Sequence, residues 1–100
     1  MTTDIQSLDG KIIASLKGEL DTAAAAEVES ALQPLLESEG RDIIIDCTDL
    51  EYIASSGLRI LLSILKKAKA TGGRVVLRGV NDLIRDVFRL TGFIDIFEFE

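Results

Sequence analysis

Two adjacent serines and a glycine, Ser55, Ser56 and Gly57, stand where an acidic loop gives way to a strongly apolar segment. We expect a helix to begin here, at about Ser56. The first N–H groups of a helix lack partners within it, and its N-terminus carries partial positive charge that suits a phosphate. One serine is expected to cap the helix, which leaves the other hydroxyl facing outward. Ser55 is therefore a candidate phosphoacceptor, and the simpler interpretation is an N-cap alone.

Other chemistries are limited by what the sequence lacks. The chain has no histidine, which excludes a Ser-His-Asp triad and histidine-based metal sites, and it has no glycine-rich phosphate loop. Its single cysteine, Cys47, is interpreted as a small buried hydrophobic residue. The carboxylates of Asp21, Asp46 and Asp49 leave a small metal-dependent hydrolase as one alternative. We expect no enzymatic activity, cofactor or metal.

The apolar segment after the serines follows helical spacing over about 56–70, with one stripe made of Leu58, Leu61, Leu62, Leu65 and Ala68. Ile60 and Ile64 lie off that stripe. Either both are buried on a broad helix face, or they form an exposed docking stripe. A docking stripe beside a phosphorylated serine would make a regulated interface.

Before the serines, the sequence predicts strands over 5–8 and 11–17, a helix over 23–38, a strand over 42–47 and an acidic loop over 48–54. After the helix that begins at the serines, it predicts a strand over 74–77, a third helix and an edge strand over 94–99. The third helix is expected to be capped by Asn81 or Asp82 and to have one apolar face, made of Leu83, Ile84, Val87 and Phe88. The Asp9-Gly10 pair predicts a hairpin turn, because both residues accept positive φ. Pro34 is expected to kink or split its helix. Three consecutive isoleucines, 43–45, indicate a strand buried on both faces in a parallel sheet.

This order predicts one α/β domain over residues 1–100: a mixed sheet with an antiparallel N-terminal hairpin and three or more helices packed against it. The loops that follow parallel strands meet at one edge of such a sheet. That edge should bring together Asp21, Asp46, Asp49, Ser55 and Arg78.

Charge and hydropathy limit the partners. The net charge of −6 repels nucleic acid phosphates and anionic membrane surfaces, so we expect neither nucleic acid nor membrane as a partner. No apolar run approaches the roughly 20 residues that span a bilayer. No basic region followed by an apolar run occurs near Met1, so we expect no signal peptide and a cytoplasmic location.

Several short motifs occur in an order and spacing typical of one family: Gly18-Glu19-Leu20-Asp21, Ile43-Ile44-Ile45-Asp46, Asp49-Leu50, Ser55-Ser56-Gly57-Leu58, Thr71-Gly72-Gly73 and Leu90-Thr91-Gly92. With them the chain resembles the STAS domain, and within it the bacterial anti-sigma factor antagonists, over nearly its whole length. The resemblance implies a (βα) superhelix packed on a mixed sheet.

The resemblance also implies partner switching. An antagonist of this kind binds an anti-sigma factor that is also a serine kinase, is phosphorylated by it with ATP and released, and is reset by a serine phosphatase. The family's phosphoserine maps onto Ser55, and Asp21 matches an acidic residue that supports its loop. The partner-binding surface is expected to include Asp21, Asp49, Ser56, Gly57, Arg59, Ile60 and Ile64.

One residue departs from the family's pattern. Ala54 stands where the residue before the phosphoserine is usually acidic. The alternative function is therefore a STAS interaction module of a transporter or of a stressosome-like scaffold, not regulated by phosphorylation.

Overall fold

A single mixed β-sheet is the framework of the chain, and the computed structural model describes all residues from 1 to 100. Its six strands, in chain order, are β1 (Thr2–Leu8), β2 (Lys11–Leu20), β3 (Ile43–Asp46), β4 (Leu50–Ile53), β5 (Val75–Arg78) and β6 (Glu98–Phe99). The helical elements are α1 (Thr22–Ala31), the 3₁₀ segment η1 (Gln33–Glu37), α2 (Ser55–Ala70), α3 (Asp82–Leu90) and the 3₁₀ segment η2 (Phe93–Asp95).

The strands lie in the order β1-β2-β3-β5-β6, and β4 pairs with the far end of β2. Only the β1–β2 pair is antiparallel; the other pairs are parallel. The turn between β1 and β2 has positive φ at Asp9 (51°) and Gly10 (77°), which confirms the predicted hairpin. All three isoleucines of β3 are buried, as expected for a central strand between two parallel neighbours.

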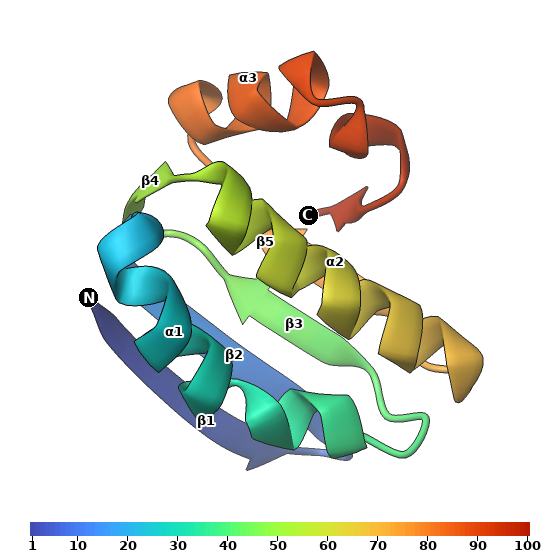
Figure 1. Cartoon of the computed structure of the whole chain (residues 1–100). Helices are drawn as coiled ribbons and strands as arrows, with labels where there is room; N and C mark the ends of the chain where they lie inside the picture. The colour runs from blue at the N-terminus through green and yellow to red at the C-terminus, as the bar shows by residue number, and fades with distance from the viewer.

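Two helices, α1 and α2, lie side by side over one face of the sheet, and α3 lies beyond the end of α2 where Ser55 stands (Figure 1). The core forms between the helices and the sheet face, and it includes Ala14 and Ile45 from the strands and Leu61 from α2. A small aromatic group holds the C-terminal region in place. The ring of Phe88 on α3 meets the rings of Phe97 and Phe99 edge-on, with both centroids 5.5 Å away.

Three predicted elements differ from the observed ones. The helix expected over 23–38 is split: α1 ends at Ala31, and Pro34 stands in the first turn of η1, so the predicted break is confirmed. The acidic loop expected over 48–54 is wrong in part, because β4 occupies 50–53. The edge strand expected over 94–99 shortens to β6, which follows η2.

The prediction for the buried face of α3 is partly wrong. Ile84 and Phe88 are buried, but Leu83 is 63% exposed. The aromatic contacts of Phe88 set the rotation of the helix, and Leu83 is carried outward. None of the helices combines the length and the apolar content that crossing a membrane requires.

Candidate functional site

The candidate site lies where β2 and β4 end next to each other. The N–H of Gly18 donates to the carbonyl of Asp49 (3.0 Å), and the N–H of Ala54 donates to the carbonyl of Leu20 (2.8 Å). Asp21 and Ser55 follow directly after Leu20 and Ala54. The chain therefore leaves the sheet at two adjacent points to begin α1 and α2, so the topology brings Asp21 and Ser55 to the same sheet edge.

The start of α2 has no side-chain cap, although two serines stand there. Ala54 is the N-cap residue, with φ −90° and ψ 170°, and no side chain accepts a hydrogen bond from the first turn. The prediction that one of the serines caps the helix is therefore wrong. The other two helices are capped: Oδ1 of Asp21 accepts from the N–H of Ala24 (2.9 Å), and Oδ1 of Asn81 accepts from the N–H of Ile84 (2.8 Å).

The two serines have different surroundings. Ser55 is exposed at the first position of α2. The hydroxyl oxygen of Ser56 is buried and has no hydrogen-bond partner, although most buried polar atoms are paired. Only the hydroxyl of Ser55 is therefore open to another protein.

Gly57 is buried and holds the start of α2 close to the sheet. A Cβ atom at this position would lie 2.7 Å from Cγ of Leu20 and 3.0 Å from Cγ1 of Ile53. Its backbone is ordinary helix, so the glycine is required for space and not for a special φ. The ends of β2 and β4 fix the first turn of α2 through this contact.

Ser55 opens onto a shallow hollow between α2 and the C-terminal region. Its walls are Ser55, Leu58, Arg59, Leu62, Thr91 and Phe93. None of these residues is acidic, and Arg59 is the one charged residue among them. The carboxylates of Asp21 and Glu51 line a separate acidic hollow with Glu19 and Glu27.

Sequence reasoning missed Thr91 and Phe93 as neighbours of Ser55. The Leu90-Thr91-Gly92 motif marked the end of α3, and Gly92 indeed has positive φ there (80°). Nothing in the local pattern says that this turn packs beside a helix that begins 36 positions earlier.

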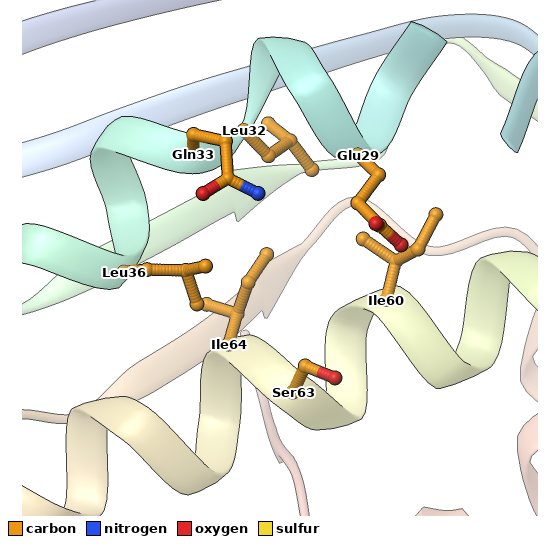
Figure 2. A pocket seen from close by; sticks show the side chains of 7 residues that line it. All are labelled: Glu29, Leu32, Gln33, Leu36, Ile60, Ser63 and Ile64. Atoms are coloured by element: carbon orange, nitrogen blue, oxygen red, sulfur yellow. The ribbon is translucent and has the colours of Figure 1, made fainter. Parts of the chain in front are cut away.

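Of the two interpretations of Ile60 and Ile64, burial on a broad face of the helix is confirmed, and the exposed docking stripe is wrong. The two residues are 6% and 2% exposed, because α2 turns this face toward α1. Figure 2 shows both side chains pointing into the hollow between the two helices. This hollow has a volume of about 170 Å³ and is lined by Glu29, Leu32, Gln33, Leu36, Ile60, Ser63 and Ile64.

Asp46 and Arg78 pair with each other in the β3–β5 register but have local partners of their own. Oδ1 of Asp46 accepts from the hydroxyl (2.6 Å) and the N–H (3.0 Å) of Thr48, and these bonds lower the pKa of the carboxyl. Arg78 lies 3.8 Å from a carboxylate oxygen of Glu100. No three His, Cys, Asp or Glu side chains gather as a metal site would need.

Cys47 is a buried core residue, as predicted. It is 1% exposed, and burial raises the pKa of its thiol to about 12. A thiol with that pKa is almost wholly protonated at neutral pH, so it is a poor nucleophile.

Comparison with known proteins gives a consistent result. The STAS domain model matches residues 2–100. A relative from Bordetella bronchiseptica, BtrV, named as a candidate anti-sigma factor antagonist, is 33% identical over 97% of this chain and 84% of its own. The solved structure of an anti-sigma factor antagonist from Mycobacterium paratuberculosis is 31% identical, covers 98% of this chain and 83% of its own, and has a TM-score of 0.82.

A more distant fold neighbour is the Bacillus cell fate determinant SpoIIAA in its phosphorylated form. It is 22% identical, covers 99% of this chain and 91% of its own, and has a TM-score of 0.73. At that identity the likeness concerns the fold alone.

Proposed function

The chain belongs to the STAS domain family, and on that premise we propose that it is an anti-sigma factor antagonist that works by binding and not by catalysis. The match over residues 2–100 supports this, as does the 31% identity to a solved antagonist. The proposed partner is an anti-sigma factor, and the proposed location is the cytoplasm. Binding would keep the anti-sigma factor from its sigma factor and so affect transcription.

Regulation is proposed to act at Ser55. The exposure of this hydroxyl at the uncapped start of α2 is the observation that carries the proposal. The partner, a serine kinase, would transfer the γ-phosphoryl group of ATP to Oγ of Ser55, releasing ADP and a proton. Hydrolysis by a serine phosphatase would restore the hydroxyl. The phosphate adds nearly two negative charges to the surface that meets the partner.

The proposed docking surface surrounds the starts of α1 and α2. Asp21 directly follows the end of β2, Asp49 directly precedes β4, and Arg59 is exposed one turn after Ser55. Gly57 is proposed to act indirectly, because its packing on Leu20 and Ile53 holds the first turn of α2 in place, and Ser56 through its place in that same turn, where its hydroxyl oxygen is buried.

The proposal is tested by incubating the chain with its cognate kinase and ATP and locating the phosphate by mass spectrometry. One phosphate on Ser55 is expected. In a binding assay, Ser55→Ala should retain the anti-sigma factor and Ser55→Asp should weaken binding at least tenfold. Ser63→Asp is the matched control, because Ser63 is also exposed on α2 and the substitution adds the same charge.

The alternative function rests on Ala54, which replaces the acidic residue of the family's pattern. If Ser55 stays unmodified and Ser55→Asp binds as well as the unaltered chain, the phosphorylation switch is wrong. An interaction module of a transporter or a stressosome-like scaffold is then favoured.

A further inference from the structure

Arg59 has no ion-pair partner, although it is exposed on an acidic protein. The three ion pairs of the structure are Arg74–Glu98, Arg78–Glu100 and Arg89–Asp86. Arg59 lies four positions after Ser55, and both side chains line the same hollow. The cation closest in sequence to the candidate phosphoacceptor is therefore unpaired and beside it.

The spacing of these two residues favours a direct contact. Residues four apart on a helix have Cβ atoms about 5–6 Å from each other, and an anion placed N-terminal to a cation is the better order. A guanidinium group also presents a planar fork that binds phosphate with two hydrogen bonds. A long arginine side chain at position 59 can reach an anion at position 55 without any movement of the backbone.

Nothing else in the hollow would compete for either group. Its other walls come from α2, from the end of α3 and from η2, and they are Leu58, Leu62, Thr91 and Phe93. Three charged residues of α3 have partners of their own: Arg89 forms an ion pair with Asp86 (2.6 Å), and Arg85 lies over the ring of Phe99 (4.9 Å). The carboxylates of the acidic hollow, Asp21 and Glu51 among them, lie outside this group of residues.

We propose that Arg59 is the intramolecular counter-ion of a phosphate on Ser55. This inference rests on the proposed phosphorylation of Ser55 and adds how that modification acts. Phosphorylation then changes the docking surface in two ways, because it adds an anion and also withdraws the free cation of Arg59. In the unmodified chain, Arg59 is available to a carboxylate of the partner.

The test uses the full chain with phosphoserine incorporated at position 55 during translation, so that no kinase is needed. The second pKa of the phosphate is measured by ³¹P NMR between pH 5 and 8, with circular dichroism to confirm the fold. Because Arg59 stabilises the dianion, Arg59→Gln should raise this pKa by about 0.2–0.4 units, and the pKa in Arg59→Lys should lie between those of the parent and of Arg59→Gln.

Lys66→Gln is the matched control. It removes the same charge from an exposed position of the same helix that lies about 16 Å from Ser55 along the axis, beyond the screening length of about 10 Å in 0.1 M salt. The phosphate of this variant should titrate like that of the parent. Equal pKa values in the parent and in Arg59→Gln would overturn the pairing. If Lys66→Gln shifted the phosphate pKa as much as Arg59→Gln does, the pairing would also be wrong, because the shift would come from the overall charge of the chain and not from a specific contact.

Failure of the inference and failure of the proposed function give different results. A kinase that does not modify Ser55 would end the proposed switch but would leave the ³¹P titration as predicted. Equal phosphate pKa values in the parent and in Arg59→Gln would contradict the pairing with Arg59. Phosphorylation of Ser55 and docking of the partner would still be tested by the kinase and binding assays.

Discussion

The starts of α1 and α3 differ in construction from the start of α2. In α1 and α3, a side-chain oxygen of Asp21 or Asn81 accepts a hydrogen bond from the first turn. In α2 the N-cap residue is Ala54, and the turn is held instead by the packing of Gly57 on the ends of β2 and β4. A cap occupies an N–H group, whereas packing from the opposite side leaves the N–H groups free.

The difference separates two tasks that one residue usually performs at a helix start. Gly57 positions the first turn of α2, so Ser55 does not have to. A hydroxyl engaged as a cap would have to give up its hydrogen bond to be modified. Here it is exposed beside unpaired N–H groups and beside Arg59, which suits a residue proposed to gain and lose a phosphate.

Among these substitutions, Gly57→Ala should lower the stability of the chain most, because it removes the packing that distinguishes the start of α2. The added methyl group would overlap Leu20 and Ile53, and overpacking of this kind costs about 1–3 kcal/mol. Thermal unfolding should show a fall in Tm of at least 4 °C, since about 1 kcal/mol corresponds to roughly 4–8 °C in a domain of this size.

Ser63→Ala, an exposed substitution on the same helix, is the control and should stay close to the parent. Helix propensity alone predicts the reverse sign for Gly57→Ala, because alanine is favoured over glycine by about 1 kcal/mol inside a helix. A rise in Tm would therefore show that packing does not hold the start of α2.

Removal of the two caps should have a smaller effect, and the two effects should differ. Asp21→Ala should lower the free energy of unfolding in urea by about 1 kcal/mol. Asn81→Ala should lose about 2 kcal/mol, because Nδ2 of Asn81 also donates to the carbonyl of Leu50 (3.2 Å). Asn81→Asp keeps the cap and loses only that donor, so it should lie nearer to the parent. Equal losses in the two alanine variants would contradict this assignment.

The smallest predicted effect is a gain. Ala54→Asp should cap α2 as Asp21 caps α1, and raise the free energy of unfolding by about 0.5–1 kcal/mol. Ala54→Gly, which supplies no side-chain acceptor, is the control for backbone effects at this position. If the aspartate variant is no more stable than the glycine variant, the N–H groups in the first turn of α2 are not available to a side-chain cap.

Local signals in the sequence predicted much of the fold. The Asp9-Gly10 turn, the buried isoleucines of β3 and the Asn81 cap each follow from a residue's own conformational preference or from its immediate neighbours. The family-like order of motifs indicated how these pieces are arranged. Pro34 likewise predicted the break between α1 and η1.

The errors concern features that tertiary packing decides. The sequence predicts a loop where β4 lies, and the observed burial of β4 explains this: Leu50 and Ile53 are buried while the two residues between them are exposed, which is not the alternation typical of a strand. Its pairing with β2 follows a change of register at Gly18. The first residue of α2 was predicted one position late, and the contact of Gly57 with the sheet explains that boundary.

The candidate site was predicted in part. The meeting of Asp21 and Ser55 at one sheet edge follows from parallel topology, although β4 itself was not expected, and the exposure of Ser55 agrees with the proposed modification. Its electrostatic character was not foreseen. Asp21 and Glu51 line another hollow, and the fold brings Thr91 and Phe93 from the far end of the chain to Ser55 instead.

Because Cys47 is buried, the reactivity of its thiol reports how often the sheet around it opens. This thiol lies at the end of β3 in the middle of the sheet, with 1% of its surface exposed. A thiol reagent can modify it only when the strands around it separate, so the rate of labelling reports how often they do. Since the chain has no second cysteine, a probe attached through a new surface cysteine would be the only fast-reacting position on the native protein.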